Sequence, residues 1–375
     1  MLIRRLLTRL TLFLLPFGII IGGMISLTIY SGEAMPYEQV AALQYINPKL
    51  IYFPEFNTGT SQTFTYKLAS LKQHPKSQVL ILGSSRVLAF QAQLIDSPSH
   101  FYNFGIQGSY LDGSLSVLNA LTAETMPDVI ILGVDVFWFN ANPNNETRKD
   151  RPLTVQPLEF SKILEISQFF AQSLLKGDIN WMMPLNRRNL TGDNTALGLS
   201  AQSSGRGFRV DGSFQSNTNL VEANRDRNIA EVYQTRSTTL GGDSMADAGF
   251  VTLEQFLIRA DDLGIEVIGF LPPYLPELYT FIQTGGQHGY FEPSRAQIKR
   301  IFERHGVSLF DFSDIQQFGV GAEEMNDFVH PSGRLSARMF AIMAREIPSL
   351  HAYADPDRIE RAIADSPDPI HIFGD

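Results

Sequence analysis

Five short apolar runs, alternating with helical patterns, constrain the fold of this chain more than any other feature. The runs span 79–82, 102–104, 129–134, 267–271 and 307–312, and helical patterns occupy 86–95, 111–124, 253–263 and 294–304. The first, third and fourth runs are rich in Val, Ile and Leu without a period of two, which is typical of strands covered on both faces. Strand–helix alternation predicts a parallel sheet with helices on both sides, an α/β sandwich. In such sheets the ligand site lies at the carboxyl ends of the strands.

The N-terminus carries a long apolar run. Three arginines in the first nine residues precede an uncharged stretch, Leu10 to Tyr30. At ~1.5 Å per residue this stretch spans roughly 30 Å, the thickness of a bilayer core. The arginines before it and Glu33 after it favour a cytoplasmic N-terminus. A cleaved signal peptide is the alternative, with 32–34 as small residues for cleavage, although its apolar core is normally only about 7 to 15 residues long. We expect a single-pass anchor over 1–34, in the cell membrane, with the rest extracytoplasmic.

Composition excludes several classes of function. Acidic residues exceed basic ones by 39 to 30, so nucleic acid is not expected as a partner. The absence of cysteine excludes thiol nucleophiles, disulfides and zinc-thiolate sites. The histidines show no metal-ligand spacing, and we expect neither a metal nor another cofactor. The remainder, 35–375, is expected to form one domain, interrupted by an insertion at about 148–248 that becomes polar and turn-rich after an amphipathic stretch.

The first apolar run ends on Gly83-Ser84-Ser85. Alone, this motif predicts a turn with Ser84 or Ser85 as a helix N-cap, and it lacks the glycine patterns of phosphate loops, dinucleotide folds and nucleophile elbows. Two later stretches change its interpretation: "NFGIQG" at 103–108 and "DFVHPSG" at 327–333. A serine nucleophile needs an imidazole base, and that base needs a carboxylate to fix its tautomer.

Together these stretches resemble the SGNH or GDSL hydrolase superfamily. The resemblance implies a three-layer α/β/α, flavodoxin-like fold with a serine nucleophile after the first strand. It places Ser85 as the nucleophile, with Ser84 where the family has Asp. Gly108 would donate to the oxyanion together with the Ser85 N–H, and Asp327 would orient His330 as the general base.

The resemblance covers roughly 79–347 and departs from the family in one block. The family has Gly-x-Asn-Asp, whose Asn donates to the oxyanion, whereas this chain has Gly133 in register and Asp135 in the Asn position. An ionised carboxylate has no proton to donate and repels negative charge. Three interpretations remain open: Asp135 is structural, Asn140 supplies the donor, or the site is impaired. Both residues are candidates for lining the site.

Three further features have both a functional and a simpler structural interpretation. Gly242-Asp243-Ser244 matches the family's name-giving motif, but it follows no apolar strand and too little chain separates it from Asp327. Tyr274, after two prolines, lines a substrate pocket or simply follows a strand end. For Arg86 there are two interpretations: it binds an anionic substrate, or it is an exposed charge in the first turn of a helix.

Two hypotheses of function follow. The first is a serine esterase or O-acyltransferase that forms an acyl-serine intermediate at Ser85 and passes the acyl group to water or to a sugar or polyol hydroxyl. The architecture resembles membrane-anchored envelope-polymer acyltransferases, such as the D-alanine transfer protein of teichoic acid modification and the alginate acetylation proteins. This implies an acyl-ester or glycan substrate of the cell envelope and a membrane acyl-donor partner protein. The alternative is a non-catalytic envelope-binding or scaffold protein of the same fold.

Overall fold

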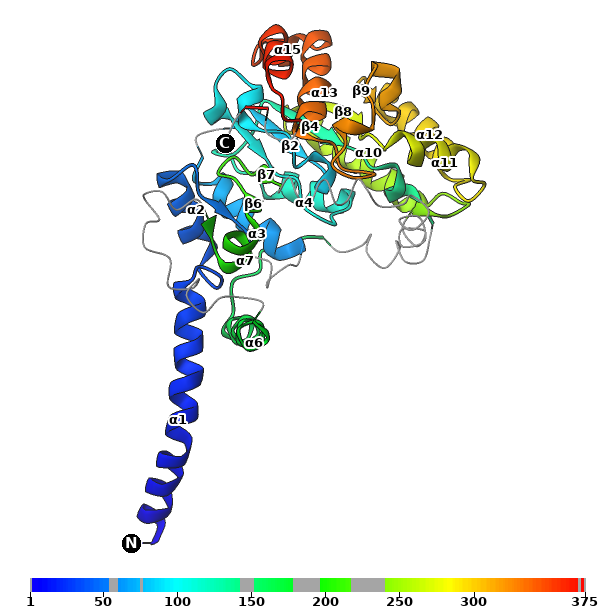
Figure 1. The fold of residues 1–375 in the computed structure, drawn as a ribbon. Coiled ribbons are helices and arrows are strands. Elements are labelled where there is room, and N and C mark those ends of the chain that lie inside the picture. Colours follow the sequence, from blue (N-terminus) through cyan, green and yellow to red (C-terminus); the bar gives the residue numbers. More distant parts are fainter. Residues whose placement is uncertain are drawn as a thin grey trace.

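The structure, a computed structural model, describes residues 2–53, 60–74, 77–141, 152–177, 196–216, 240–369 and 372–373. A five-stranded parallel sheet forms its centre (Figure 1). Its strands are β2 (Val79–Leu82), β3 (Phe101–Asn103), β4 (Val129–Gly133), β8 (Glu266–Leu271) and β9 (Ser308–Asp311). They pair in the order β3-β2-β4-β8-β9. In chain order this is 2-1-3-4-5, a common doubly wound arrangement, so the expected α/β class and parallel sheet are confirmed.

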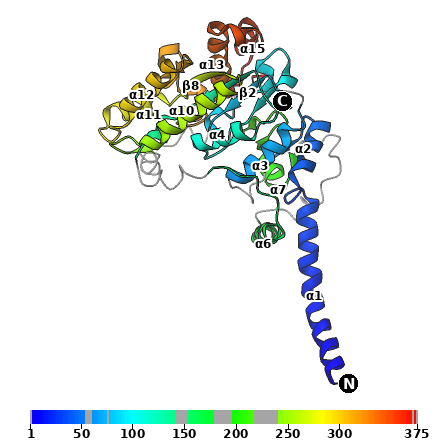
Figure 2. The same cartoon turned by 180° about the vertical axis from the view of Figure 1, so that it is seen from behind.

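Helices cover both faces of this sheet. Along β2, Leu80 and Leu82 point into one hydrophobic core, and Val79 and Ile81 point into the other. The first core includes α3 (Thr60–Leu71), α4 (Leu111–Ala120), α10 (Asp247–Asp262), α11 (Pro276–Thr284) and α12 (Phe291–Arg304). The second includes α13 (Gly333–Glu346), α14 (Pro348–His351) and α15 (Pro356–Asp365). Figures 1 and 2 show α13 and α15 above the sheet and α3 and α4 below it. Burial on both faces explains why the strands are continuously apolar.

The predicted helix over 86–95 is wrong. The chain there forms two short 3-10 turns, η2 (Ser85–Val87) and η3 (Ala92–Leu94). The buried side-chain amide of Asn103 donates to the carbonyl oxygens of Val87 and Phe90. Because these carbonyls are satisfied by a neighbouring strand, the segment stays folded without the backbone ladder of an α-helix.

A small second sheet connects the insertion to the N-terminal part of the chain. Its strands are β1 (Ile51–Tyr52), β5 (Ala196–Leu197), β6 (Gly207–Phe208) and β7 (Phe214–Gln215), in the order β5-β1-β6-β7. The buried Lys67 Nζ ties this region to the main sheet by donating to the carbonyls of Asn103 and Gly212, at 2.9 and 2.7 Å. Of the predicted insertion, 148–151, 178–195 and 217–239 lie outside the described residues.

The N-terminal helix α1 (Leu2–Tyr30) projects from the body of the molecule (Figures 1 and 2). The most apolar 18 residues within Ile3–Tyr30 have a mean hydropathy of 2.3, and the helix is long and apolar enough to span a membrane. Its side chains are exposed as far as Gly23, and from Met24 onwards they begin to pack against the rest of the chain. Three further helices complete the description: α2 (Tyr37–Ile46), α6 (Phe160–Lys176) and α7 (Leu199–Ser204).

Candidate active site

The turn after β2 positions Ser85 at the carboxyl end of the sheet. Gly83 has a φ of +150°, and a Cβ there would lie 2.7 Å from a methyl group of Val87 and 3.1 Å from the Gly133 carbonyl, so only glycine fits. The Ser84 hydroxyl accepts a hydrogen bond from the Arg86 N–H at 3.2 Å, which makes Ser84 the predicted N-cap. Ser85 therefore begins η2 with its own side chain free to face outward.

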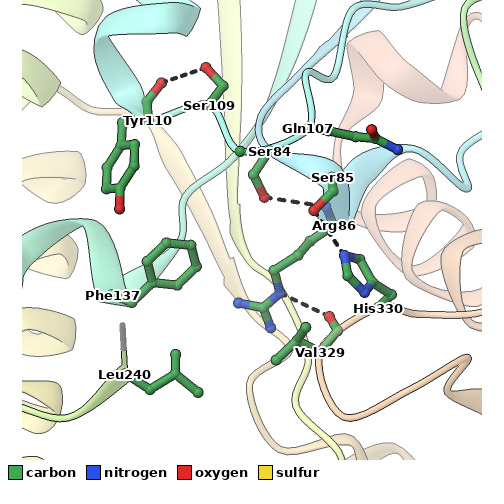
Figure 3. Close-up of a pocket in the computed structure, with 11 residues that line it drawn as sticks. Ser84, Ser85, Arg86, Gln107, Ser109, Tyr110, Phe137, Leu240, Val329 and His330 are labelled. Atoms are coloured by element: carbon green, nitrogen blue, oxygen red, sulfur yellow. Dashed lines mark hydrogen bonds between the residues drawn. The ribbon is translucent and has the colours of Figure 1, made fainter. Parts of the chain in front are cut away.

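The Ser85 hydroxyl contacts the imidazole of His330, the residue predicted to be its base. The distance from Ser85 Oγ to His330 Nε2 is 2.8 Å, and that from His330 Nδ1 to Asp327 Oδ2 is 2.7 Å (Figure 3). Since an ionised carboxylate only accepts, His330 Nδ1–H donates to Asp327, and Nε2 is left to accept from the serine. The three side chains thus form a continuous hydrogen-bonded series of hydroxyl, imidazole and carboxylate, an arrangement that can serve as nucleophile, base and orienting acid.

Asp327 is held in its ionised form. Burial opposes ionisation of this carboxyl, but the charge and hydrogen bond of His330 act in the other direction. Two backbone N–H groups, of Val329 and His330, also donate to Asp327 Oδ1 at 2.9 and 2.8 Å. The result is a pKa below the usual range for Asp327, so the group is a carboxylate at neutral pH.

A cavity of about 290 Å³ opens beside Ser85 and His330. Its lining consists of Ser84, Ser85, Arg86, Gln107, Gly108, Ser109, Tyr110, Phe137, Leu240, Val329 and His330. Gly108 adopts a φ of +68°, and within the described residues neither its N–H nor that of Ser85 donates to a protein acceptor. Two residues of the cavity lining, Ser85 and Gly108, therefore have backbone N–H groups without an acceptor among the described residues.

Arg86 is buried behind the site and links four segments. Its side chain is 2% exposed, and its Nη1 donates to Asp135 Oδ1 at 2.6 Å, where Asp135 is 1% exposed. Its Nε donates to the Val329 carbonyl at 2.9 Å, and its Nη2 to the Pro273 carbonyl. The guanidinium lies 4.2 Å from the centre of the Tyr274 ring. Arg86 therefore joins the serine turn to the ends of β4 and β8 and to the histidine loop.

These contacts decide the roles of several predicted residues. Arg86 lines the cavity, but the expectation of an exposed charge is wrong, because Asp135 neutralises it in the interior. Asp135 is buried, paired with Arg86 and absent from the cavity lining, which favours the structural interpretation among the three. Tyr274 lies beneath Arg86 and not in the cavity lining, and the Asn140 side-chain amide donates to the Gly241 carbonyl at 2.8 Å, also outside that lining.

The sequence did not indicate the apolar wall of the cavity. Tyr110 and Phe137 follow the second and third strands, and Leu240 comes from the end of the insertion (Figure 3). Phe137 belongs to the aromatic run Phe137-Trp138-Phe139, a pattern more typical of packing than of a binding site, and no local pattern distinguishes Leu240. The Gly242-Asp243-Ser244 motif lies in the loop before α10, with Ser244 exposed, and it does not contribute to the cavity lining.

No group of three or more His, Asp or Glu side chains within the described ranges is arranged to hold a metal ion. Comparison with known proteins found no match, whether to a family model, to a curated protein or to a solved structure.

Proposed function

We propose that this chain is a membrane-anchored serine esterase or O-acyltransferase of the SGNH type. The observation that carries the proposal is the continuous hydrogen-bonded series from Ser85 through His330 to Asp327, at the wall of a cavity. The series lies at the carboxyl ends of a doubly wound parallel sheet, the expected position of a ligand site. The strand order and the positions of the three residues agree with the flavodoxin-like arrangement that the sequence resemblance implies.

The geometry supports acyl transfer in two steps. Ser85 Oγ attacks the ester carbonyl while His330 Nε2 takes its proton, and Asp327 stabilises the resulting imidazolium. The N–H groups of Ser85 and Gly108 donate to the tetrahedral oxyanion. The C–O bond to the leaving alcohol breaks as His330 returns the proton to it, leaving an acyl-serine. Water or an acceptor hydroxyl then attacks with His330 again as base, which releases the acid or a new ester and restores Ser85.

The oxyanion site we propose has two donors where the resembled family has three. Asp135 is held by Arg86 away from the cavity lining, so it neither donates to the oxyanion nor repels it at close range. Loss of one donor typically costs about 10²- to 10³-fold in rate. We therefore expect a slower enzyme than a three-donor relative of the same mechanism, but not an inactive one.

The anchor suggests where the substrate is. With the three N-terminal arginines in the cytoplasm, α1 would place the catalytic body outside the membrane. An acyl ester or glycan of the cell envelope is the substrate class that we propose, and the cavity at Ser85 is lined by aromatic and aliphatic groups suited to an acyl chain or sugar face. A membrane acyl-donor protein would supply the activated acyl group if the reaction is a transfer.

A fluorophosphonate probe, which forms a covalent bond with activated serines, tests the proposal on the full chain in detergent. We expect labelling to disappear in Ser85→Ala and to persist in Ser244→Ala, the matched control at the second motif. Labelling that survives Ser85→Ala would exclude Ser85 as the reactive serine, and no labelling of the unaltered chain would favour the scaffold alternative. Incubation with acetyl and alanyl ester donors, with and without oligosaccharide, then separates acid release from acyl transfer.

A further inference from the structure

The amphipathic helix α6 packs beside α1 and leaves part of its apolar surface uncovered. On its inner side Phe170 is fully buried and packs with Leu174 against Leu199, Met24 and Leu27, the last two from α1. A second apolar strip on α6 is left uncovered by the part of the chain that the structure describes. The strip consists of Phe160, Leu164 and Leu175, whose side chains are 65%, 39% and 88% exposed.

The strip occupies one side of the helix. At roughly 100° per residue, Phe160, Leu164 and Leu175 fall within an arc of roughly 60°, next to the face that contacts α1. The exposed polar residues Gln168 and Gln172 lie beyond it, on the side away from the buried face. The helix therefore presents three successive surfaces: one against protein, one apolar and uncovered, and a third that is polar except for Phe169, which is 47% exposed.

The position of α6 along α1 indicates what covers the strip. It contacts Met24 and Leu27, which precede Tyr30, the end of the apolar run, by six and three residues. At ~1.5 Å per residue these contacts lie about 9 and 4.5 Å inside that end. Helices that lie in the membrane interface bury their apolar face by about 5 to 10 Å, which is the same depth.

The direction of α6 fits the same location. In Figures 1 and 2, α1 runs along the length of the picture while α6 is seen end-on, so α6 runs across the direction of α1. A helix perpendicular to a membrane span lies parallel to the membrane plane. Apolar side chains of α1 are exposed as well, from Ile3 to Ile21.

We propose that α6 lies in the membrane interface on the side of the catalytic body, with Phe160, Leu164 and Leu175 inserted at the boundary between headgroups and acyl chains. This rests on α1 spanning the membrane and is independent of the chemistry at Ser85. The segment before α6 is fixed to the body, because the Leu153 N–H donates to Ser116 Oγ of α4 and the Gln156 N–H to Thr65 Oγ1 of α3, both at 2.9 Å. A span and an in-plane helix together would hold the body at a set height and orientation, which a single flexible tether would not.

Site-directed spin labelling tests this on the full chain. Because the chain has no cysteine, each introduced cysteine is unique. Nitroxides are attached at Leu164→Cys and Leu175→Cys on the strip, and at Gln168→Cys and Gln172→Cys on the polar side of the same helix. Each variant is reconstituted in phosphatidylcholine–phosphatidylglycerol vesicles, with Phe13→Cys in α1 as the membrane reference. The measurement is the ratio of collisions with oxygen, which concentrates in lipid, to collisions with a water-soluble nickel complex.

The proposal predicts a ratio several-fold higher at Leu164→Cys and Leu175→Cys than at Gln168→Cys and Gln172→Cys. Equal ratios at all four positions would show that the strip faces water and would overturn it. Low collision rates with both reagents at the strip would show that protein covers it, a second copy or another partner, and would overturn it as well. A water-like ratio at Phe13→Cys would remove the membrane span and the interfacial helix together, while leaving the fluorophosphonate result at Ser85 unaffected.

Discussion

Replacing Asp135 with asparagine distinguishes a structural from a catalytic role for this position. The change installs the residue that the SGNH pattern has there, so a catalytic position would gain an oxyanion donor. In the structure, however, Asp135 Oδ1 accepts from Arg86 at 2.6 Å, and Asp135 is absent from the cavity lining. We therefore expect Asp135→Asn to destabilise the fold and to give no gain in rate.

The expected loss of stability follows from the burial of the pair. The Arg86 and Asp135 side chains are only 2% and 1% exposed, so solvent does not screen the charge left behind. Removing one partner of a buried pair costs about 3 to 5 kcal/mol. Asparagine does not rescue it, because Asp135 Oδ2 has no hydrogen-bond partner among the described residues and an amide NH₂ in that place would be a buried, unpaired donor.

Urea unfolding of the full chain in detergent, followed by tryptophan fluorescence, measures this loss, because Trp138 is buried in the core. Glu254→Gln is the matched control, since it neutralises the partner of Arg304 in a pair of similar length, 2.9 Å, whose side chains are 36% and 56% exposed. A partly exposed pair contributes about 0.2 to 1 kcal/mol. The cost of Glu254→Gln should fall further at high salt, whereas that of Asp135→Asn should not.

Two results would refute this reasoning. One is a free energy of unfolding for Asp135→Asn within about 0.5 kcal/mol of that of the unaltered chain. Loss of one partner would then cost far less than is typical of a buried ion pair, and the pair would not stabilise the site. If fluorophosphonate labelling accelerates by about 10²-fold, the new amide reaches the oxyanion and the position is catalytic.

Three further predictions concern other parts of the site and the core. Asp327→Asn should slow labelling of Ser85 by about 10²- to 10⁴-fold. Because the pKa of Asp327 is lowered in the fold, the stability that this carboxylate contributes should be present above pH ~4 and lost as pH falls below it. The difference in the free energy of unfolding between Asp327→Asn and the unaltered chain, measured in urea, should therefore shrink in acid. Gly108→Ala should slow labelling, because a Cβ strained at a φ of +68° displaces an N–H group in the cavity lining, whereas Gly177→Ala, at a similar φ of +78° but outside that lining, should cost only the conformational strain of about 1 kcal/mol. Burial lowers the pKa of Lys67 in the fold despite the nearby Asp211. Between this lowered pKa and the pKa of lysine in the unfolded chain, the unfolded chain binds more protons than the folded one. The free energy of unfolding should therefore rise with pH up to about 10, and Lys67→Met should flatten that rise.

The central sheet was predictable because its strands are apolar runs that alternate with helical patterns. The run 79–82 forms β2 with the predicted limits, and the other four strands begin and end within one residue of their runs. The serine, histidine and aspartate could also be found, because acyl transfer requires these residue types and the ends of parallel strands meet at one edge. The small sheet of β1, β5, β6 and β7 could not, since two-residue strands carry no periodicity.

The buried contacts of charged residues could not be predicted from the sequence, for a different reason. Arg86 follows a serine cap, where a charge is normally solvated, and nothing local shows that Asp135 lies beside it 49 residues later. Likewise, the helix expected after Ser85 does not form. The Asn103 side-chain amide donates to two backbone carbonyls of that segment, which in an α-helix would accept from N–H groups of the segment itself. Both outcomes are set by strands adjacent in the sheet but distant in the chain.

The two departures from the SGNH pattern can be explained together by one buried ion pair. Ser84, in place of Asp, still caps the turn by accepting from the Arg86 N–H, so the turn does not need a carboxylate. Asp135, in place of Asn, supplies the negative charge that a buried Arg86 requires. Arg86 in turn donates to the Val329 carbonyl, next to His330, and thereby connects the nucleophile turn to the histidine loop. The hydroxyl, imidazole and carboxylate lie in series at 2.8 and 2.7 Å, and the buried arginine joins the two loops that carry them. Under the proposed function, the departures are thus an altered means of holding Ser85 and His330 together.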